Sequence, residues 1–211
     1  MASDGNFITE FVIPLFPKGA AGICIDIGAY DPEWINNSIE LEQIGWTCYC
    51  IEPNPHCIPA LKAKRPHVLE YAVGDRNEDD VEFNIYHAYP LPHHPEHLGE
   101  AGYTGILKHP EIQGLTLTTE KVKLRTFEWL MENEIKEPHV DFISIDVEGN
   151  EMAVLSTLDV SRWRPKVIVC ENSHSDKEQH DWFERNGFGM IKRHCDNDIY
   201  VRLSEINLRI G

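Results

Sequence analysis

Five short segments of almost uniformly apolar residues recur along the chain, and polar residues close most of them. They are ICIDI (23–27), CYCIE (48–52), HVLEYAV (67–73), VDFISID (140–146) and KVIVCEN (166–172). Strands with one solvated face alternate apolar and polar residues, whereas strands buried on both faces do not, and such strands are typical of parallel sheets. The pattern therefore predicts a mainly parallel sheet with polar residues at its carboxyl edge.

Helical segments separate these strands, at residues 37–44, 55–64, 126–135, 150–158 and 176–186. Alternation of strand and helix favours an α/β fold with helices on both faces of the sheet. The end of the chain departs from this order, because Asp196-Asn197 joins two strand-like runs, and such a pair is typical of a tight turn. We expect one α/β domain, residues 1–211, that ends in an antiparallel β-hairpin.

Residues 82–122 interrupt this regular order. Prolines, glycines and histidines are frequent there, and the periodicity is weak. We expect a flanking strand at 81–87, a long loop, and a returning strand at 120–126. A long loop inside a compact domain usually serves a function, so we predict a lid on the substrate side of a binding site. A partly disordered excursion is the alternative.

The charge of the chain limits its partners. Acidic residues outnumber basic ones 35 to 19, which gives a formal charge of −16. Affinity for nucleic acids and for anionic membranes comes from concentrated positive charge, so neither is an expected partner. The chain also has no apolar run of membrane-spanning length and no zinc-binding cysteine spacing, and we expect no export signal. We expect a cytoplasmic protein with a neutral or cationic ligand.

The first strand runs into a glycine turn, in the segment IDIGAYDP. Gly28 permits close approach of the backbone to a ligand above the carboxyl edge of the sheet. Glu52 ends the next strand, where a carboxylate can accept hydrogen bonds from both hydroxyls of a ribose. Ala72 and Val73 offer a flat wall to an adenine ring. Because the glycines that cradle a diphosphate are missing, we expect a nucleoside ligand without one, and a nicotinamide-dependent oxidoreductase is disfavoured.

Several of these segments together resemble the FkbM family of class I S-adenosylmethionine-dependent methyltransferases. They are CIDIGAYDP, GWTCYCIEPNP, LRTFEWL, and VDFISIDVEGNEMAVL followed by KVIVCENSH. The resemblance implies a Rossmann-like seven-stranded sheet with a terminal hairpin, S-adenosyl-L-methionine as cofactor, and methyl transfer to an oxygen, often of a sugar or secondary metabolite. The turn at Tyr30-Asp31-Pro32 departs from the family's pattern. The cofactor contacts expected here are Asp26, Gly28, Ala29, Tyr30, Ser38, Glu52, Pro53, Ala72, Val73, Asp146 and Glu148.

Three oxygen-bearing side chains end neighbouring strands, namely Asp146, Glu171 and Asn172. The carboxyl ends of parallel strands lie together, so these side chains are expected to converge. Oxygen ligands suit magnesium or manganese, and the arrangement resembles the metal site of catechol-type O-methyltransferases. In the alternative interpretation, Asp146 caps the following helix, Glu171 faces solvent and Asn172 shapes a turn.

Methyl transfer from a sulfonium releases a neutral leaving group, so the protein has to position and deprotonate the acceptor oxygen. A metal held by Asp146 lowers the pKa of a bound hydroxyl, and His174 is the candidate base. The leading hypothesis is a divalent-metal-dependent O-methyltransferase of a sugar or glycan. One alternative is a metal-independent O-methyltransferase of a small metabolite, with Asp146 and Glu148 at the amino-acid end of the cofactor. The other is a nucleoside-binding regulatory module without catalysis. The sequence predicts no oligomeric state.

Overall fold

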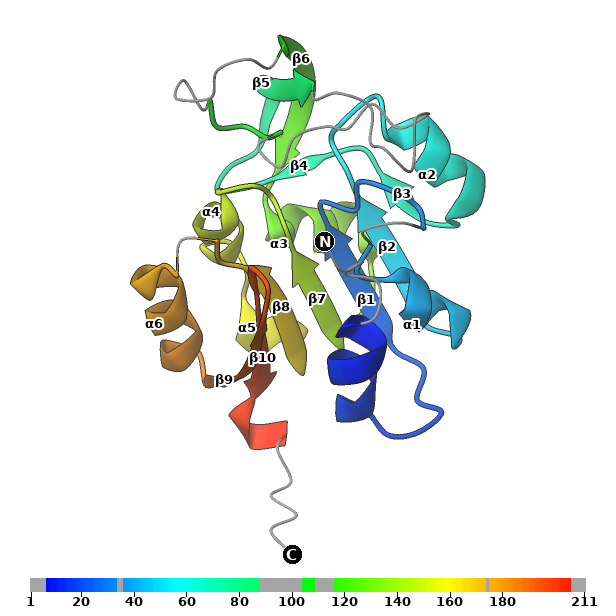
Figure 1. The fold of residues 1–211 in the computed structure, drawn as a ribbon, viewed down its shortest axis with the longest axis vertical. Coiled ribbons are helices and arrows are strands. Elements are labelled where there is room, and N and C mark those ends of the chain that lie inside the picture. Colours follow the sequence, from blue (N-terminus) through cyan, green and yellow to red (C-terminus); the bar gives the residue numbers. More distant parts are fainter. Residues whose placement is uncertain (1–6, 34–35, 88–103, 109–115, 174, 206–211) are drawn as a thin grey trace, which may run out of the picture.

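The computed structural model describes residues 7–33, 36–87, 104–108, 116–173 and 175–205, and Figure 1 shows their arrangement. Seven of its strands form one sheet. In spatial order they are β3 (Val68–Leu69), β2 (Thr47–Ile51), β1 (Ile23–Ile27), β7 (Phe142–Ile145), β8 (Val167–Glu171), β10 (Asn197–Arg202) and β9 (Phe188–His194). The pairs from β3 to β8 are parallel, and β10 is antiparallel to both of its neighbours. The predicted seven-stranded, mainly parallel sheet is confirmed.

The order of the strands places the ends of β1 and β7 side by side. The chain moves outward from β1 to β3 and then returns to the other side of β1 as β7. Ligands of open α/β sheets bind in the crevice at such a reversal, outside the carboxyl ends of the strands. A ligand-binding site is therefore expected among the residues that follow β1, β2, β7 and β8.

Helices cover both faces of this sheet, as predicted (Figure 1). One core packs Ile25 and Ile143 against α3 (Phe127–Leu130), η4 (Met131–Ile135), α4 (Glu151–Leu155), α5 (Val160–Trp163) and α6 (Lys177–Arg185). The other packs Cys24 and Phe142 against η2 (Ile8–Val12), η3 (Ile13–Leu15) and α1 (Ile39–Gln43). On α2 (Ile58–Lys64), Leu61 packs against Cys50, and η5 (Leu203–Glu205) follows β10. Among these helices, α5 and the short helices η2, η3 and η5 are not predicted from the sequence.

A second sheet lies beyond the carboxyl edge of the first (Figure 1). It contains β4 (Ala72–Val73), β6 (Thr116–Arg125) and β5 (Glu78–His87), in that order. The sequence predicts one strand over 67–73, and this prediction is wrong. Val68–Leu69 pairs with β2 in the first sheet, whereas Ala72–Val73 pairs with β6 in the second. The chain passes between the sheets because Ala72 is buried in a separate apolar core with Phe83 and Leu124.

The predicted insert at 82–122 contributes parts of β5 and β6 to this second sheet, and its role as a lid stays a prediction. The strands expected at 81–87 and 120–126 are present but longer, and residues 104–108 lie against β5 through a bridge between Asn84 and Gly105. The remainder of the loop, 88–103 and 109–115, lies outside the described residues. Within the described ranges, no helix combines the length and apolar content needed to cross a membrane.

Candidate active site

The turn after β1 touches the end of β7 through backbone atoms. Gly28 has a φ of +86°, and a Cβ built on it would lie 1.8 Å from the carbonyl oxygen of Asp146. The amide of Gly28 donates to the carbonyl of Ile51 (2.9 Å), and the amide of Asp146 donates to the carbonyl of Ile27 (3.0 Å). Gly28 therefore lies where three strand ends meet. The close approach at Gly28 is to the backbone of Asp146, and the predicted approach to a ligand stays a prediction.

The carboxylate of Glu52 is held by two backbone donors. Its Oε2 accepts from the amide of Tyr30 and its Oε1 from the amide of Asn54, both at 2.8 Å. Tyr30 is left-handed, with a φ of +46°, so the unusual turn after Gly28 is tied to this carboxylate. Each carboxylate oxygen can accept more than one hydrogen bond. Glu52 is thus fixed in orientation.

Asp26 and Ser38 lie in the interior beneath this turn, with 1% and 0% exposure. The Ser38 hydroxyl donates to Asp26 Oδ2 at 2.6 Å, and Arg65 Nη2 donates to Ser38 Oγ at 2.9 Å. Burial raises the pKa of Asp26 to about 6, against the opposing effects of the Ser38 hydrogen bond and the Arg65 charge. These groups satisfy one another inside the protein. Their role as cofactor contacts stays a prediction.

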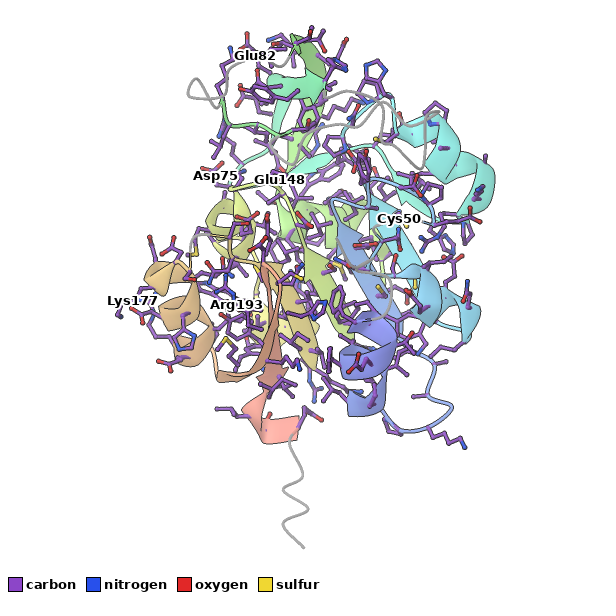
Figure 2. The ribbon with its side chains drawn as sticks, viewed as in Figure 1. Cys50, Asp75, Glu82, Glu148, Lys177 and Arg193 are labelled. Carbon is purple, nitrogen blue, oxygen red and sulfur yellow. The ribbon has the colours of Figure 1, made fainter. Side chains whose placement is uncertain are left out.

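Four carboxyl groups influence one another at the ends of β7 and β8. They are Asp146, Glu148, Glu151 and Glu171. Burial first, and then the charges of Glu171 and Glu151, raise the pKa of Glu148 to about 8. Burial and Glu171 also raise the pKa of Asp146 well above its usual value. Figure 2 places Glu148 at the top of the large sheet, below β5 and β6. Such a group favours either bound protons or a bound cation.

Both polar atoms of the Asn172 side chain form hydrogen bonds within the protein. Asn172 is 6% exposed. Its Nδ2 donates to Asp198 Oδ2 at 2.9 Å, and its Oδ1 accepts from the amide of Asp176 at 2.6 Å. Asp176 is the N-cap of α6. Asn172 therefore shapes the turn between β8 and α6, as the alternative interpretation of this residue predicts.

The comparisons with known proteins agree with this geometry. The model of the methyltransferase FkbM domain matches residues 26–191, a range that includes Gly28, Glu52 and Asp146. The chain belongs to the FkbM methyltransferase family. No curated protein sequence matches the chain. The sequence-based resemblance to this family is confirmed, and the seven-stranded sheet is consistent with a methyltransferase fold.

One solved structure is similar to this FkbM methyltransferase domain. It is the crystal structure of methyltransferase FkbM from Methylobacillus flagellatus KT, with a TM-score of 0.56 and 15% sequence identity. The similar region covers 90% of this chain and 46% of that chain, so this chain spans less than half the length of the other protein. At this identity the likeness shows a shared fold alone.

The predicted metal site of this FkbM domain is not supported. The amide oxygen of Asn172 would have to face the ion, but it accepts a hydrogen bond from the backbone of Asp176. Glu171 Oε1 accepts from the Ser173 hydroxyl at 2.6 Å. Across the described part of the chain, no group of three or more His, Cys, Asp or Glu side chains is placed to hold a metal ion. The predicted base, His174, lies outside the described residues.

A cavity of about 450 Å³ opens beside the ends of β2 and β3. Pro53, a predicted cofactor contact, lines it together with residues of β3, α2, β6 and η4, including Ile58, Leu69 and Glu134. Ala72 and Val73, the predicted adenine wall, are buried in β4, and their contact with the cofactor stays a prediction. The backbone of Ala29, another predicted contact, donates to the carbonyl of Ile51 at 3.2 Å.

Glu151, on the first turn of α4, is a residue of this region that the sequence pattern does not single out. Its Oε1 accepts from the amides of Val147 (3.2 Å) and Gly149 (3.1 Å). Glu151 therefore shapes the turn that carries Glu148, whose φ is +56°. The glycine and the acid two residues later, in EGNE, are the sequence signal of this turn.

Proposed function

We propose that this FkbM methyltransferase domain transfers the methyl group of S-adenosyl-L-methionine to a hydroxyl oxygen of a sugar, a glycan or another small metabolite. When bound, the cofactor supplies a methyl group activated by a positively charged sulfur. The observation that carries the proposal is Glu52, a carboxylate with a fixed orientation at the end of β2 beside the Gly28 turn. A carboxylate in this position binds the hydroxyls of a ribose.

The residues around Glu52 fit the remaining parts of the cofactor. Asp146 and Glu148 belong to a group of carboxyls whose raised pKa values disfavour negative charge, so a cationic ligand relieves their repulsion. The methionine end of the cofactor carries an ammonium beside the positive sulfur. The cavity at Pro53 has room for an adenine ring. These residues bind and orient the donor, which is the main requirement of an in-line displacement.

The acceptor hydroxyl also has to lose its proton. His174 is the predicted base, and Glu148 is a second candidate because a carboxyl with a pKa of about 8 accepts protons at mildly alkaline pH. The engaged amide of Asn172 favours the metal-independent form of the reaction over the metal-dependent one. A base supplied by the protein is then needed.

Exhaustive chelation is expected to leave methyl transfer unchanged within about twofold. The reason is that the amide oxygen needed as a metal ligand is committed to Asp176. The measurement is release of S-adenosylhomocysteine in the presence of a panel of hydroxylated acceptors, with and without a chelator. Loss of turnover that returns on addition of manganese would establish the metal-dependent form.

The Glu52→Gln variant is expected to bind S-adenosylhomocysteine roughly 10 to 100 times more weakly, because hydrogen bonds to a charged group contribute about 1.5–3 kcal/mol. In this variant one of the two acceptor oxygens becomes an NH2 group, which cannot accept the hydrogen bond of the backbone N–H that faces it. Titration calorimetry measures the effect. Glu33→Gln is the matched control, since Glu33 belongs to the same turn region but pairs with Lys64 at the surface. Equal affinity in the two variants would remove Glu52 from the cofactor site.

A nucleoside-binding module without catalysis is the competing interpretation. Such a module would make the same cofactor contacts as a methyltransferase but would not catalyse methyl transfer. Conversion of S-adenosylmethionine to S-adenosylhomocysteine in the presence of any acceptor rules it out, whereas tight binding without turnover across a broad acceptor panel would favour it.

A further inference from the structure

Asn84 is a fully buried polar residue inside an otherwise apolar stretch of β5. Its neighbours Phe83 and Ile85 belong to the apolar core of the second sheet, and Asn84 itself is 0% exposed. Its Nδ2 lies 3.1 Å from the carbonyl of Ile106, with the carbonyls of Gly105 and Leu107 at 3.4 and 3.5 Å. The two hydrogens of this amide therefore face three consecutive carbonyl groups, of which that of Ile106 is the nearest.

We call residues Thr104–Lys108 the wall segment. Its backbone meets β5 at a single bridge, where the amide of Asn84 donates to the carbonyl of Gly105 (2.8 Å) and the amide of Gly105 donates back (3.0 Å). The hydroxyl of Thr104 also accepts from the amide of Tyr86 at 3.2 Å. No strand ladder continues from this bridge within the described residues. The side chain of Asn84 thus supplies most of the remaining polar contacts to β5.

The other side of the wall segment lies against the turn that carries Glu148. A Cβ built on Gly105 would lie 3.4 Å from the carbonyl oxygen of Val147 and 3.7 Å from the Cβ of Glu148. A Cβ built on Gly149 would lie 3.6 Å from Cδ1 of Leu107. The wall segment therefore lies close to the Val147–Gly149 turn, in which Val147 and Glu148 are half-buried and Gly149 is exposed.

We propose that Asn84 is a positioning residue that holds the wall segment against the Val147–Gly149 turn and so fixes one side of the space above Glu148. Without the Asn84 side chain, the carbonyls of Ile106 and Leu107 lose their donor from β5, whereas the carbonyl of Gly105 keeps the backbone amide of Asn84. The side chain therefore favours this one placement of the segment. The idea that this space receives the acceptor molecule rests on the proposed function. The positioning role of Asn84 is independent of the proposed function.

The test compares the Asn84→Ala variant with Lys108→Met. Lys108 belongs to the same segment but bonds Glu82 at the surface, at 2.9 Å, so its loss should leave the wall segment in place. In Asn84→Ala, hydrogen exchange is expected to accelerate at least tenfold at the amide of Gly105 and at the amides of Val147 and Gly149. In Lys108→Met these rates should stay within about twofold of the parent protein.

A second readout follows the carboxyl of Glu148 by carbon NMR. Asp146, Glu151 and Glu171 face it from β7, α4 and β8, and Lys108 in the wall segment is paired with Glu82. These charges stay the same in Asn84→Ala, but water gains access, so the pKa of Glu148 should fall from about 8 toward the usual value for glutamate. A merely structural role for Asn84 would leave this titration unchanged.

Asn84→Leu carries the same test if Asn84→Ala does not fold, because it keeps a similar side-chain volume, adds no charge and loses the donor to the three carbonyls. A folded variant of either kind with parent-like exchange at Val147 and Gly149 and a parent-like Glu148 titration overturns the proposal. Binding of S-adenosylhomocysteine by the parent protein is measured in parallel. If the variants respond as expected but the parent binds no S-adenosylhomocysteine, the proposed function fails and the positioning role stands.

Discussion

The Gly28→Ala variant is expected to lose the folded state, or to retain it only with several kcal/mol less stability. The added Cβ would lie 1.8 Å from the carbonyl oxygen of Asp146, a backbone atom held by the hydrogen bond between β7 and β1. It cannot turn away as a flexible side chain can, so two strand ends would have to separate. The φ of +86° adds about 1–3 kcal/mol of backbone strain. Domains are typically stable by only about 5–15 kcal/mol, so the combined cost is decisive.

Gly45→Ala is the matched control for this prediction. Gly45 also has a positive φ, +98°, but a Cβ built there meets nothing within 4 Å. Its substitution therefore isolates the conformational cost, about 1–2 kcal/mol. Urea denaturation of both variants measures the difference, with circular dichroism to report the amount of folded protein. If the two variants lose the same stability, the contact between Gly28 and Asp146 does not constrain the fold.

The affinity for S-adenosylmethionine is expected to rise as the pH is raised from about 6 to about 8 and to level off above that. Burial and the neighbouring Glu171 and Glu151 raise the pKa of Glu148 to about 8, so this carboxyl is protonated in the free protein at neutral pH. A cation bound nearby favours the ionised form, so binding releases a proton. Each proton released strengthens binding up to about tenfold per pH unit below the pKa.

Titration calorimetry in two buffers with different ionisation enthalpies counts the released protons directly. S-adenosylhomocysteine lacks the positive sulfur, so its affinity should depend less on pH. The Glu148→Gln variant removes the titrating group and should flatten much of the dependence. Equal pH profiles for the parent and for Glu148→Gln would place Glu148 outside the cofactor site.

Without ligand, the same carboxyl should make the protein less stable as the pH rises. Glutamate in an unfolded chain titrates near 4.5, whereas Glu148 in the folded protein titrates near 8. Between these values the folded state binds more protons than the unfolded state, so raising the pH favours unfolding. This dependence is opposite in sign to that of ligand affinity, and thermal denaturation at a series of pH values with and without ligand separates the two.

The sequence by itself determined the α/β class, the large sheet and the family. Uniformly apolar runs such as ICIDI and DFISI become the central strands β1 and β7, because burial on both faces requires apolar residues at every position. The hairpin at the end of the chain is also predicted locally, but its turn residues are Cys195 and Asp196, because Asn197 already pairs with His194 in β10. The convergence of acids at the ends of β7 and β8 also follows from the strand pattern.

Only the tertiary structure decided which remote group each of several residues contacts. Ala72 leaves the first sheet because its partner, Leu124, lies far away in the chain. Asn172 turns inward to Asp198 instead of toward a metal, and Gly28 is required by the backbone of Asp146. Apolar periodicity is a local property that follows from strand geometry. The partner of a hydrogen bond depends on distances of a few ångströms between remote segments, and only the packed chain fixes those distances.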